Sequence, residues 1–148
     1  MKVSKKGIQA IKKHEALRLC PYLCPSEIPT IGYGNTFYED GRKVALNDDC
    51  ISEERANRLF LYVLYGFEQY VNQKVTKTLL QGQFDALVSF CYNVGKGAFA
   101  SSTLLKKVNV NPFDENIKYQ FSRWNKSNGK VLKGLVKRRK EEAEMYYI

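Results

Sequence analysis

The sequence contains a single histidine, His14, and this scarcity excludes several kinds of site. A Ser-His-Asp or Cys-His nucleophilic site would have to use that one residue, which makes it a weak hypothesis. A structural zinc site needs two ligand pairs at characteristic spacing, and although Cys20 and Cys24 are close in sequence, no second cysteine pair or histidine pair accompanies them. The four cysteines are Cys20, Cys24, Cys50 and Cys91. We therefore expect neither a metal nor a cofactor.

Long apolar runs are also missing. No stretch approaches the ~20 apolar residues that a transmembrane helix needs, so we expect no membrane span. The basic start of the chain leads into no apolar signal region, which predicts synthesis in a cytoplasm. In that compartment we expect all four cysteines to be reduced. One alternative stays open, because Cys20 and Cys24 are close enough in sequence to form a disulfide.

Positive charge is in excess. Lysine and arginine number 24 against 15 acidic residues, which gives a net charge of +9. Such a surface attracts polyanions, which include nucleic acids, membrane surfaces and anionic cell-wall polymers. The run Lys137–Lys140 is either a solvated helix face or part of a binding surface. A nucleic-acid-binding module is one rival hypothesis, but the sequence has no finger, recognition-helix or aromatic RNA-platform motif, so we expect no nucleic-acid partner.

The pattern of apolar residues predicts an α+β protein of one domain, residues 1–148. A small antiparallel sheet lobe is expected over about residues 20–50, with a strand at Thr30–Gly34 and a turn at Tyr38–Arg42. A helical lobe is expected over about residues 52–148 together with the N-terminal helix. Predicted helices begin near Ser4, Ser52, Ser102, Asn111 and Lys133, and a further helix carries Phe84 to Cys91, with Gly95 able to end it.

Glu15 stands at an unusual place in the first predicted helix. It continues the apolar stripe of Ile8 and Ile11, which runs on to Leu19. A carboxylate in such a stripe is desolvated, and this predicts a raised pKa, as a catalytic acid needs. The alternative is an ordinary carboxylate at a helix end that pairs with Arg18.

The predicted strand at Thr30–Gly34 has one face with little bulk. Ile31 and Tyr33 share one side, whereas Thr30, Gly32 and Gly34 share the other. Such a face is poor core material, but it allows a bulky ligand to lie close to the backbone.

Several segments together closely resemble the phage-type lysozymes, or endolysins. They span nearly the whole chain in the order found in that family: His14–Leu19, Pro29–Thr36, Gln83–Phe90, Asn93–Gly95, Phe99, Ser102–Leu104, Trp124, Gly134–Arg139 and Glu142. The resemblance implies a lysozyme-like fold, with a cleft between the sheet lobe and the helical lobe. It also implies a glycoside hydrolase, an N-acetylmuramidase that causes host cell lysis.

The resemblance assigns the catalytic roles to Glu15, Cys24 and Thr30. Many family members have aspartate where this chain has Cys24. A thiolate can serve there as a general base or as a nucleophile, so both inversion and retention stay open. Two competing hypotheses are that Glu27 or Asp40 positions the water, and that the protein is an inactive glycan-binding relative.

The same resemblance implies further site residues. Asn35, Tyr92 and Ser102 fall where family members line the saccharide groove, although Tyr92 is equally suited to core packing. Arg139 is expected to pair with Glu15, with Arg138 as the alternative.

The resemblance also implies where and on what the protein acts. The expected partner is bacterial peptidoglycan, and the protein is expected to be a monomer. It is made in the host cytoplasm and reaches the wall through the inner membrane by holin-type export. A lytic transglycosylase of the same fold is the alternative activity.

Overall fold

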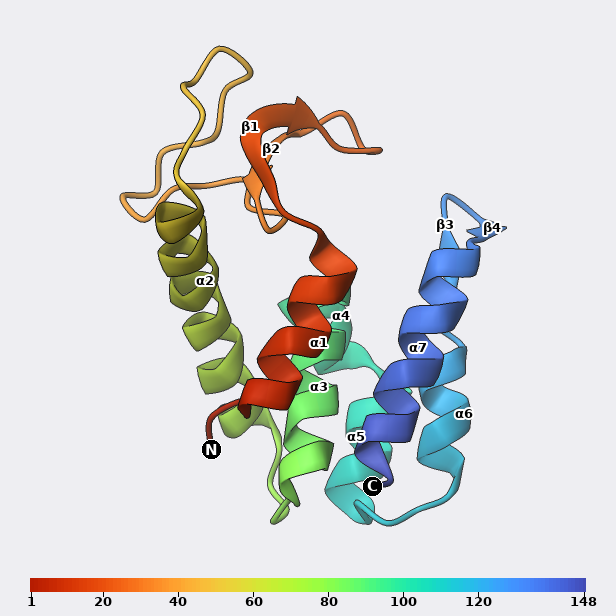
Figure 1. Ribbon diagram of the computed structural model, residues 1–148. Coiled ribbons are helices and arrows are strands. Elements are labelled where there is room, and N and C mark those ends of the chain that lie inside the picture. Colours follow the sequence, from red (N-terminus) through yellow and green to blue (C-terminus); the bar gives the residue numbers. More distant parts are fainter. The chain divides into compact units, whose positions relative to one another are not determined.

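The computed structural model describes all 148 residues and contains seven helices and two small antiparallel sheets (Figure 1). This confirms the α+β class. The chain divides into two compact units. The sheet unit comprises residues 9–66, and the helical unit comprises residues 1–8 and 67–148. The boundaries fall inside helices α1 (Lys5–Glu15) and α2 (Glu53–Lys74), so each of these helices contributes to both units.

The sheet unit is built on a hairpin of strands β1 (Arg18–Leu23) and β2 (Pro29–Gly32). The strands pair antiparallel, with Tyr22 opposite Thr30, and the register shifts between Arg18 and Tyr22. Pro21 lies in that irregular stretch, where a residue without an N–H group is tolerated.

The predicted strand over residues 30–34 is too long. Strand β2 ends at Gly32, and the backbone turns back so that Ile31 and Asn35 exchange two hydrogen bonds of 2.9 Å. Gly32 and Gly34 have φ angles of 68° and 79°, which glycine adopts without strain. The glycines therefore form a tight turn and not one face of a strand.

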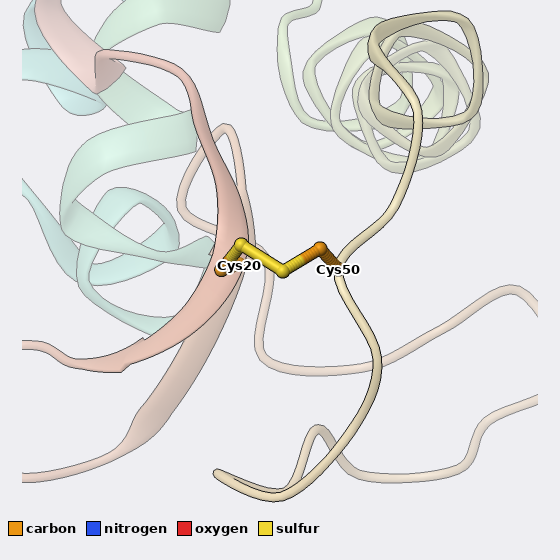
Figure 2. Close-up of a disulfide and its surroundings, with 2 residues drawn as sticks. All are labelled: Cys20 and Cys50. Carbon is orange, nitrogen blue, oxygen red and sulfur yellow. A yellow bond between two sulfur atoms is a disulfide. The ribbon is translucent and has the colours of Figure 1, made fainter.

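A disulfide joins Cys20 on β1 to Cys50 on the segment before α2 (Figure 2). The expectation that all four cysteines are reduced is therefore wrong, and so is the alternative pairing of Cys20 with Cys24. The physical reason is backbone pairing, since the Ile51 N–H donates to the Leu19 carbonyl at 2.8 Å and brings Cys50 beside Cys20. Cys24 and Cys91 are free.

The core of the sheet unit lies between its two helical segments and the β2 turn. Its most buried side chains are Ile11, Ile31, Leu59 and Phe60. The Tyr33 ring packs against Phe60 with 5.3 Å between ring centroids.

The helical unit contains most of the regular structure. Its other elements are α3 (Gln81–Val94), α4 (Lys96–Ser101), α5 (Thr103–Val110), α6 (Asn116–Ser122), β3 (Lys126–Ser127), β4 (Lys130–Val131) and α7 (Lys133–Tyr146). Phe90 is the centre of an aromatic core, with ring centroids of Phe99, Phe121 and Trp124 between 5.4 and 6.3 Å away. No helix of the chain is long and apolar enough to cross a membrane.

Helices α3 and α7 run antiparallel and approach closely. A Cβ atom at Gly82, near the start of α3, would lie only 2.5 Å from the Met145 carbonyl oxygen near the end of α7. Further along the pair, the Arg138 side chain donates to the Ser89 carbonyl at 3.4 Å. The small residue at position 82 therefore permits the contact between these two helices.

The first helix begins as predicted. The Ser4 hydroxyl accepts a hydrogen bond from the Gly7 N–H at 3.1 Å, which is the expected N-cap. Asp85 on α3 accepts from the Ser4 N–H at 3.0 Å and from the Ser4 hydroxyl. The side chain of one buried carboxylate thus anchors the start of α1 within the helical unit.

In the helical unit one predicted helix starts later than expected, and two elements were missed. The helix expected from Asn111 begins only at Asn116, because the side chains of Asn111 and Asp114 accept from backbone N–H groups two residues on and form turns. Helix α4 and the β3–β4 hairpin were not predicted. The hairpin turns at Asn128–Gly129, a typical two-residue hairpin signal.

Candidate active site

Glu15 is the last residue of α1. Ala16 has a φ of 47°, which ends the helix there. The predicted stripe therefore stops at Glu15, because Leu19 lies on β1 and is 37% exposed. Glu15 is half-buried, and its carboxylate lies against Gly34, where a Cβ atom would be 2.8 Å from Oε2. The glycine thus makes room for a carboxylate of the same unit.

Cys24 lies at the tip of the β1–β2 hairpin. Its N–H donates to the Ile28 carbonyl at 3.1 Å, and its carbonyl accepts from the Glu27 N–H at 2.8 Å. Hydrogen bonding to the backbone of Ile28 lowers the pKa of the Cys24 thiol below its usual value, although burial opposes this. The backbone of Ser26 and the Thr30 hydroxyl lower the pKa further. The turn therefore favours the thiolate, which is the reactive form of cysteine.

Thr30 is brought together with Cys24 on this hairpin. It is 2% exposed, and its hydroxyl donates to the Ile28 carbonyl at 2.8 Å. The same hydroxyl interacts with the Cys24 thiol. A hydroxyl fixed beside a thiol is suited to hold a water molecule between them.

The two carboxylates that could position water in place of Cys24 occupy different places. Glu27 shares the tip of the hairpin with Cys24 and has a left-handed φ of 60°. Asp40 lies in the predicted turn, where it accepts from the Arg42 N–H at 2.9 Å. That bond fixes Asp40 to its own turn, so Glu27 is the better placed of the two.

Asn35 is buried and closes the β2 turn. Its Oδ1 accepts from the Tyr33 N–H at 3.2 Å, and a Cβ atom at Gly32 would be 3.2 Å from that oxygen. The amide oxygen therefore supports the backbone that carries Gly34. Contact of Asn35 with a saccharide stays a prediction.

Ser102 and Tyr92 lie in the helical unit. The Ser102 hydroxyl caps α5 by accepting from the Leu105 N–H at 3.1 Å, and it donates to the Phe99 carbonyl at 2.7 Å. Ser102 also lines a polar hollow of about 310 Å³ together with Trp124 and Arg123. Tyr92 is half-buried and packs against Phe67 with 5.1 Å between ring centroids and the rings tilted by 43°. Their saccharide contacts also stay predictions.

Arg139 is fully buried within a charged cluster on α7. Its guanidinium pairs with Glu142 at 2.5 Å, and Arg138 lies 3.9 Å from the same carboxylate. Burial raises the pKa of Glu142 to about 7, although the charges of Arg139 and Arg138 lower it. Pairing of Arg139 or Arg138 with Glu15 stays a prediction.

Gly34 and Tyr22 have positions in the structure that the sequence did not predict. Gly34 was placed on a ligand-facing surface, whereas it faces the Glu15 carboxylate. Tyr22 was not singled out at all. It lies opposite Thr30 and carries the Arg18 guanidinium 4.3 Å from its ring centroid. Its position two residues before Cys24 is the signal that was available, since alternate residues of a strand share a face.

Comparison with known proteins shows similarity along nearly the whole chain. The family described as phage lysozyme matches residues 12–142. The chain is 43% identical to an endolysin of Bacillus phage B103, over 99% of this chain and 54% of that protein. It is 36% identical to an endolysin of Acyrthosiphon pisum secondary endosymbiont phage 1, over 99% and 98% of the two chains.

A solved structure, the endolysin from Escherichia coli O157:H7 phage FAHEc1, is similar in fold and sequence. It superimposes with a TM-score of 0.89 at 35% identity, covering 99% of this chain and 93% of that one. This confirms the predicted lysozyme-like fold. The chain spans about half the length of the Bacillus phage B103 relative.

Proposed function

The chain belongs to the phage lysozyme family, and we propose on this basis that it is an endolysin that hydrolyses bacterial peptidoglycan. The bond cut is the β-1,4 linkage between N-acetylmuramic acid and N-acetylglucosamine. One observation carries the assignment of the site: the Glu15 carboxylate lies against Gly34, in the same unit as the Cys24–Thr30 pair. The names of the family and of the relatives favour a hydrolase over a lytic transglycosylase or an inactive binder.

Glu15 is the proton donor of the reaction. Glycoside hydrolysis needs an acid for the leaving oxygen and a second group on the opposite side of the sugar. Glu15 gives its proton to the glycosidic oxygen as the bond to the anomeric carbon breaks. The close contact with Gly34 holds the carboxyl in one place for this transfer.

Cys24 and Thr30 position the attacking water. The Thr30 hydroxyl, whose own proton goes to the Ile28 carbonyl, accepts a hydrogen bond from one proton of the water. The Cys24 thiolate takes the other proton while the water oxygen bonds to the anomeric carbon. The product is a reducing sugar with inverted configuration. A Cys24 nucleophile, which would give retention through a covalent adduct, is the alternative that product stereochemistry distinguishes.

The remaining assignments extend the proposal to the whole substrate. Asn35, Tyr92 and Ser102 line the saccharide groove in the cleft, and Arg139 pairs with Glu15. The protein acts as a monomer on the wall, after synthesis in the host cytoplasm and holin-type export through the inner membrane.

The test is a muramidase assay on purified peptidoglycan with mass analysis of the products. We expect wild type to release reducing, non-anhydro muropeptides, Glu15→Gln to lose at least ~100-fold in rate, and Cys24→Ser to be severely impaired. The assay is run without reductant so that the Cys20–Cys50 disulfide is kept. Anhydro products would identify a transglycosylase. Binding without turnover would identify an inactive relative.

A further inference from the structure

The net positive charge of the chain comes from one segment of the helical unit. Residues 116–140 hold nine of the 24 basic residues and no acidic residue. The remaining 15 basic residues equal the 15 acidic residues in number, so this segment accounts for the whole net charge of +9. It runs from α6 through the β3–β4 hairpin into α7, and the hairpin lies at one end of these two helices (Figure 1). Charge of one sign gathered in this way attracts a polyanion to one region of the surface.

The structure separates the basic residues of this segment into a buried and an exposed group. Arg138 and Arg139 are buried beside Glu142 and lie in the core of the helical unit. Five exposed lysines follow one another along the hairpin and α7, and we call them the basic surface: Lys126, Lys130, Lys133, Lys137 and Lys140. The run at residues 137–140, for which the sequence left two interpretations, is thus divided between the core and the basic surface.

On α7 the lysines of the basic surface form a row. Lys133, Lys137 and Lys140 are three or four residues apart, so their side chains lie on one face of the helix. The Val136 side chain, which is 44% exposed, lies among them. A flexible chain of negative charges can therefore contact several ammonium groups in succession.

A hollow extends this surface towards α6. It has a volume of about 210 Å³, and its lining includes Lys118 and Ser122 of α6 and Lys140 of α7. Two ammonium groups and a hydroxyl can together hold one anionic group. Glu144 also lines the hollow, one helical turn after Lys140, and its carboxylate marks where the attraction for anions ends.

The apolar side chains of the hairpin do not gather on one face. Lys126 is paired with Val131 and Ser127 with Lys130, and paired residues of antiparallel strands share a face. Each face of the hairpin therefore carries a lysine. An element that binds a lipid surface has its apolar residues on one face, so this arrangement argues against a membrane as the partner.

The composition of the surface also argues against nucleic acids. Residues 126–140 contain no aromatic side chain, whereas proteins that bind single-stranded nucleic acids stack the bases on aromatic rings. The exposed cations of this stretch are all lysines. The arginine fork suits the paired oxygens of a carboxylate, whereas lysine acts as a point charge. A row of point charges without stacking rings suits a flexible chain of phosphodiesters that has no bases.

We propose that the basic surface binds a phosphodiester polyanion of the bacterial wall, of the polyol-phosphate type, and so holds the protein on the wall. The inference rests on the proposed function, because that function places the protein at the wall. All five lysines make the same kind of contact, so the protein can shift along the polymer without leaving it. The basic surface is thus a binding site for a wall polymer other than the glycan that is cut.

The first measurement is the binding of wild type to soluble poly(glycerol phosphate) over a series of salt concentrations. For single chains of phosphates, the logarithm of the binding constant falls with the logarithm of the salt concentration by about 0.7 per phosphate contacted, so five lysines predict a slope of about −3.5. For the triple variant Lys126→Gln/Lys130→Gln/Lys133→Gln we expect a slope of about −1.4 and binding at least ~10-fold weaker at low salt. An unchanged slope in this variant overturns the proposal.

The matched control is the triple variant Lys2→Gln/Lys5→Gln/Lys6→Gln. These three lysines are also exposed and belong to the same unit, but they lie outside the basic segment. Both triple variants lose the same charge, and thermal unfolding shows that both are folded. We expect the control to bind like wild type. Equal weakening of both variants would show that only the total charge matters, and would overturn the proposal.

The second measurement needs no lysine variant and identifies the polymer. Sedimentation with walls that carry poly(glycerol phosphate) is compared before and after hydrofluoric acid has removed the phosphodiester-linked polymers. The Glu15→Gln protein is used so that the wall is not cut. We expect extraction to remove most of the binding, and unchanged binding overturns the proposal. Tighter binding to phosphatidylglycerol vesicles, or to single-stranded DNA with the same number of phosphates, would identify a different partner and also overturn it.

Rates of wall cleavage distinguish this proposal from the proposed function. The lysine variant should cut extracted peptidoglycan as fast as wild type, because its substitutions lie outside the candidate active site. A slower rate on that substrate would place the lysines in the cleavage site and contradict the proposal. If wild type shows no muramidase activity, the proposed function fails, whereas the binding measurements still decide the role of the basic surface.

Discussion

The hairpin that carries Cys24 and Thr30 is held by hydrogen bonds to the backbone and by a nearby disulfide, whereas the aromatic core of the helical unit is held by packing. At the hairpin tip, residues 25–28 after Cys24 are all exposed, and the Cys20–Cys50 bond closes the segment that contains Cys24 and Gly34. Phe90, in contrast, is surrounded by three aromatic rings. Local backbone geometry therefore places the candidate reacting groups, and small substitutions disturb such geometry easily.

The largest effect is expected in the helical core. Phe90→Ala removes the central ring of the aromatic cluster and leaves a cavity, and we expect the free energy of unfolding to fall by about 3–5 kcal/mol. Chemical denaturation measures this loss. Phe113→Ala is the control, since Phe113 is 62% exposed and its removal leaves no cavity. A loss below about 1 kcal/mol for Phe90→Ala would show that the core refills the space.

The next effect concerns the disulfide. The double variant Cys20→Ser/Cys50→Ser opens a loop closed over 30 residues, and the expected loss of unfolding free energy is about 3–4 kcal/mol. Hydrogen exchange should speed up in residues 9–66 and stay unchanged in the aromatic core of the helical unit. Cys24→Ser serves as the control because it keeps the disulfide. If hydrogen exchange became faster by the same factor in both units, the disulfide would not stabilise the sheet unit selectively.

A smaller expected effect is on catalysis. Gly34→Ala places a methyl group 2.8 Å from Glu15 Oε2, and we expect displacement of the carboxyl to lower kcat about 100-fold. Gly41→Ala is a matched control, since Gly41 also has a left-handed φ, 84°, but a Cβ atom there meets nothing within 4 Å. Both variants therefore share the backbone strain. Equal rates for the two variants would disprove the steric role of position 34.

The smallest effect, taken over any single pH unit, is a pH dependence of stability. The pKa of Glu142 is raised to about 7 in the folded state from 4.5, so the folded protein binds this proton more tightly than the unfolded chain does. The stabilising contribution is therefore complete below pH 4.5 and is lost as the pH rises to about 7, by at most about 1.4 kcal/mol per pH unit. The glutamine in Glu142→Gln cannot titrate. Between pH 4.5 and about 7, the free energy of unfolding of this variant should therefore rise relative to that of wild type. A constant difference between the two proteins would contradict the raised pKa.

The sequence was sufficient for the features that depend on periodicity and on motif order. Ser4 caps the first helix as predicted, and the phage-lysozyme resemblance carried by Glu15, Thr30 and the later segments is confirmed by the comparisons. Helix α3 ends at Val94, and Gly95 after it has a φ of 94°, which glycine adopts without strain. Features of this kind are encoded over a few neighbouring residues, so a single sequence reveals them.

Features that depend on contacts between distant residues were missed. Cys50 is 30 residues from Cys20, and only the backbone pairing of Leu19 with Ile51 brings the two sulfur atoms together. The contact between Gly34 and Glu15 is similar, because the left-handed turn after β2 decides which atom fills the space beside the glycine. Assignments of Asn35, Tyr92, Ser102 and Arg139 to the substrate or to Glu15 remain predictions for the same reason.

The close pairing of α3 with α7 restricts how the length of these helices can vary. The Gly82–Met145 and Ser89–Arg138 contacts are separated by seven residues on each helix. Seven residues are close to two helical turns, so both contacts lie along one seam. Inserting a single residue between them in either helix would rotate everything beyond it by about 100° and move one contact off the seam. Only matched insertions or deletions of about two turns in both helices would preserve the pairing, so in related chains we expect the length of this part of α3 to change together with that of α7.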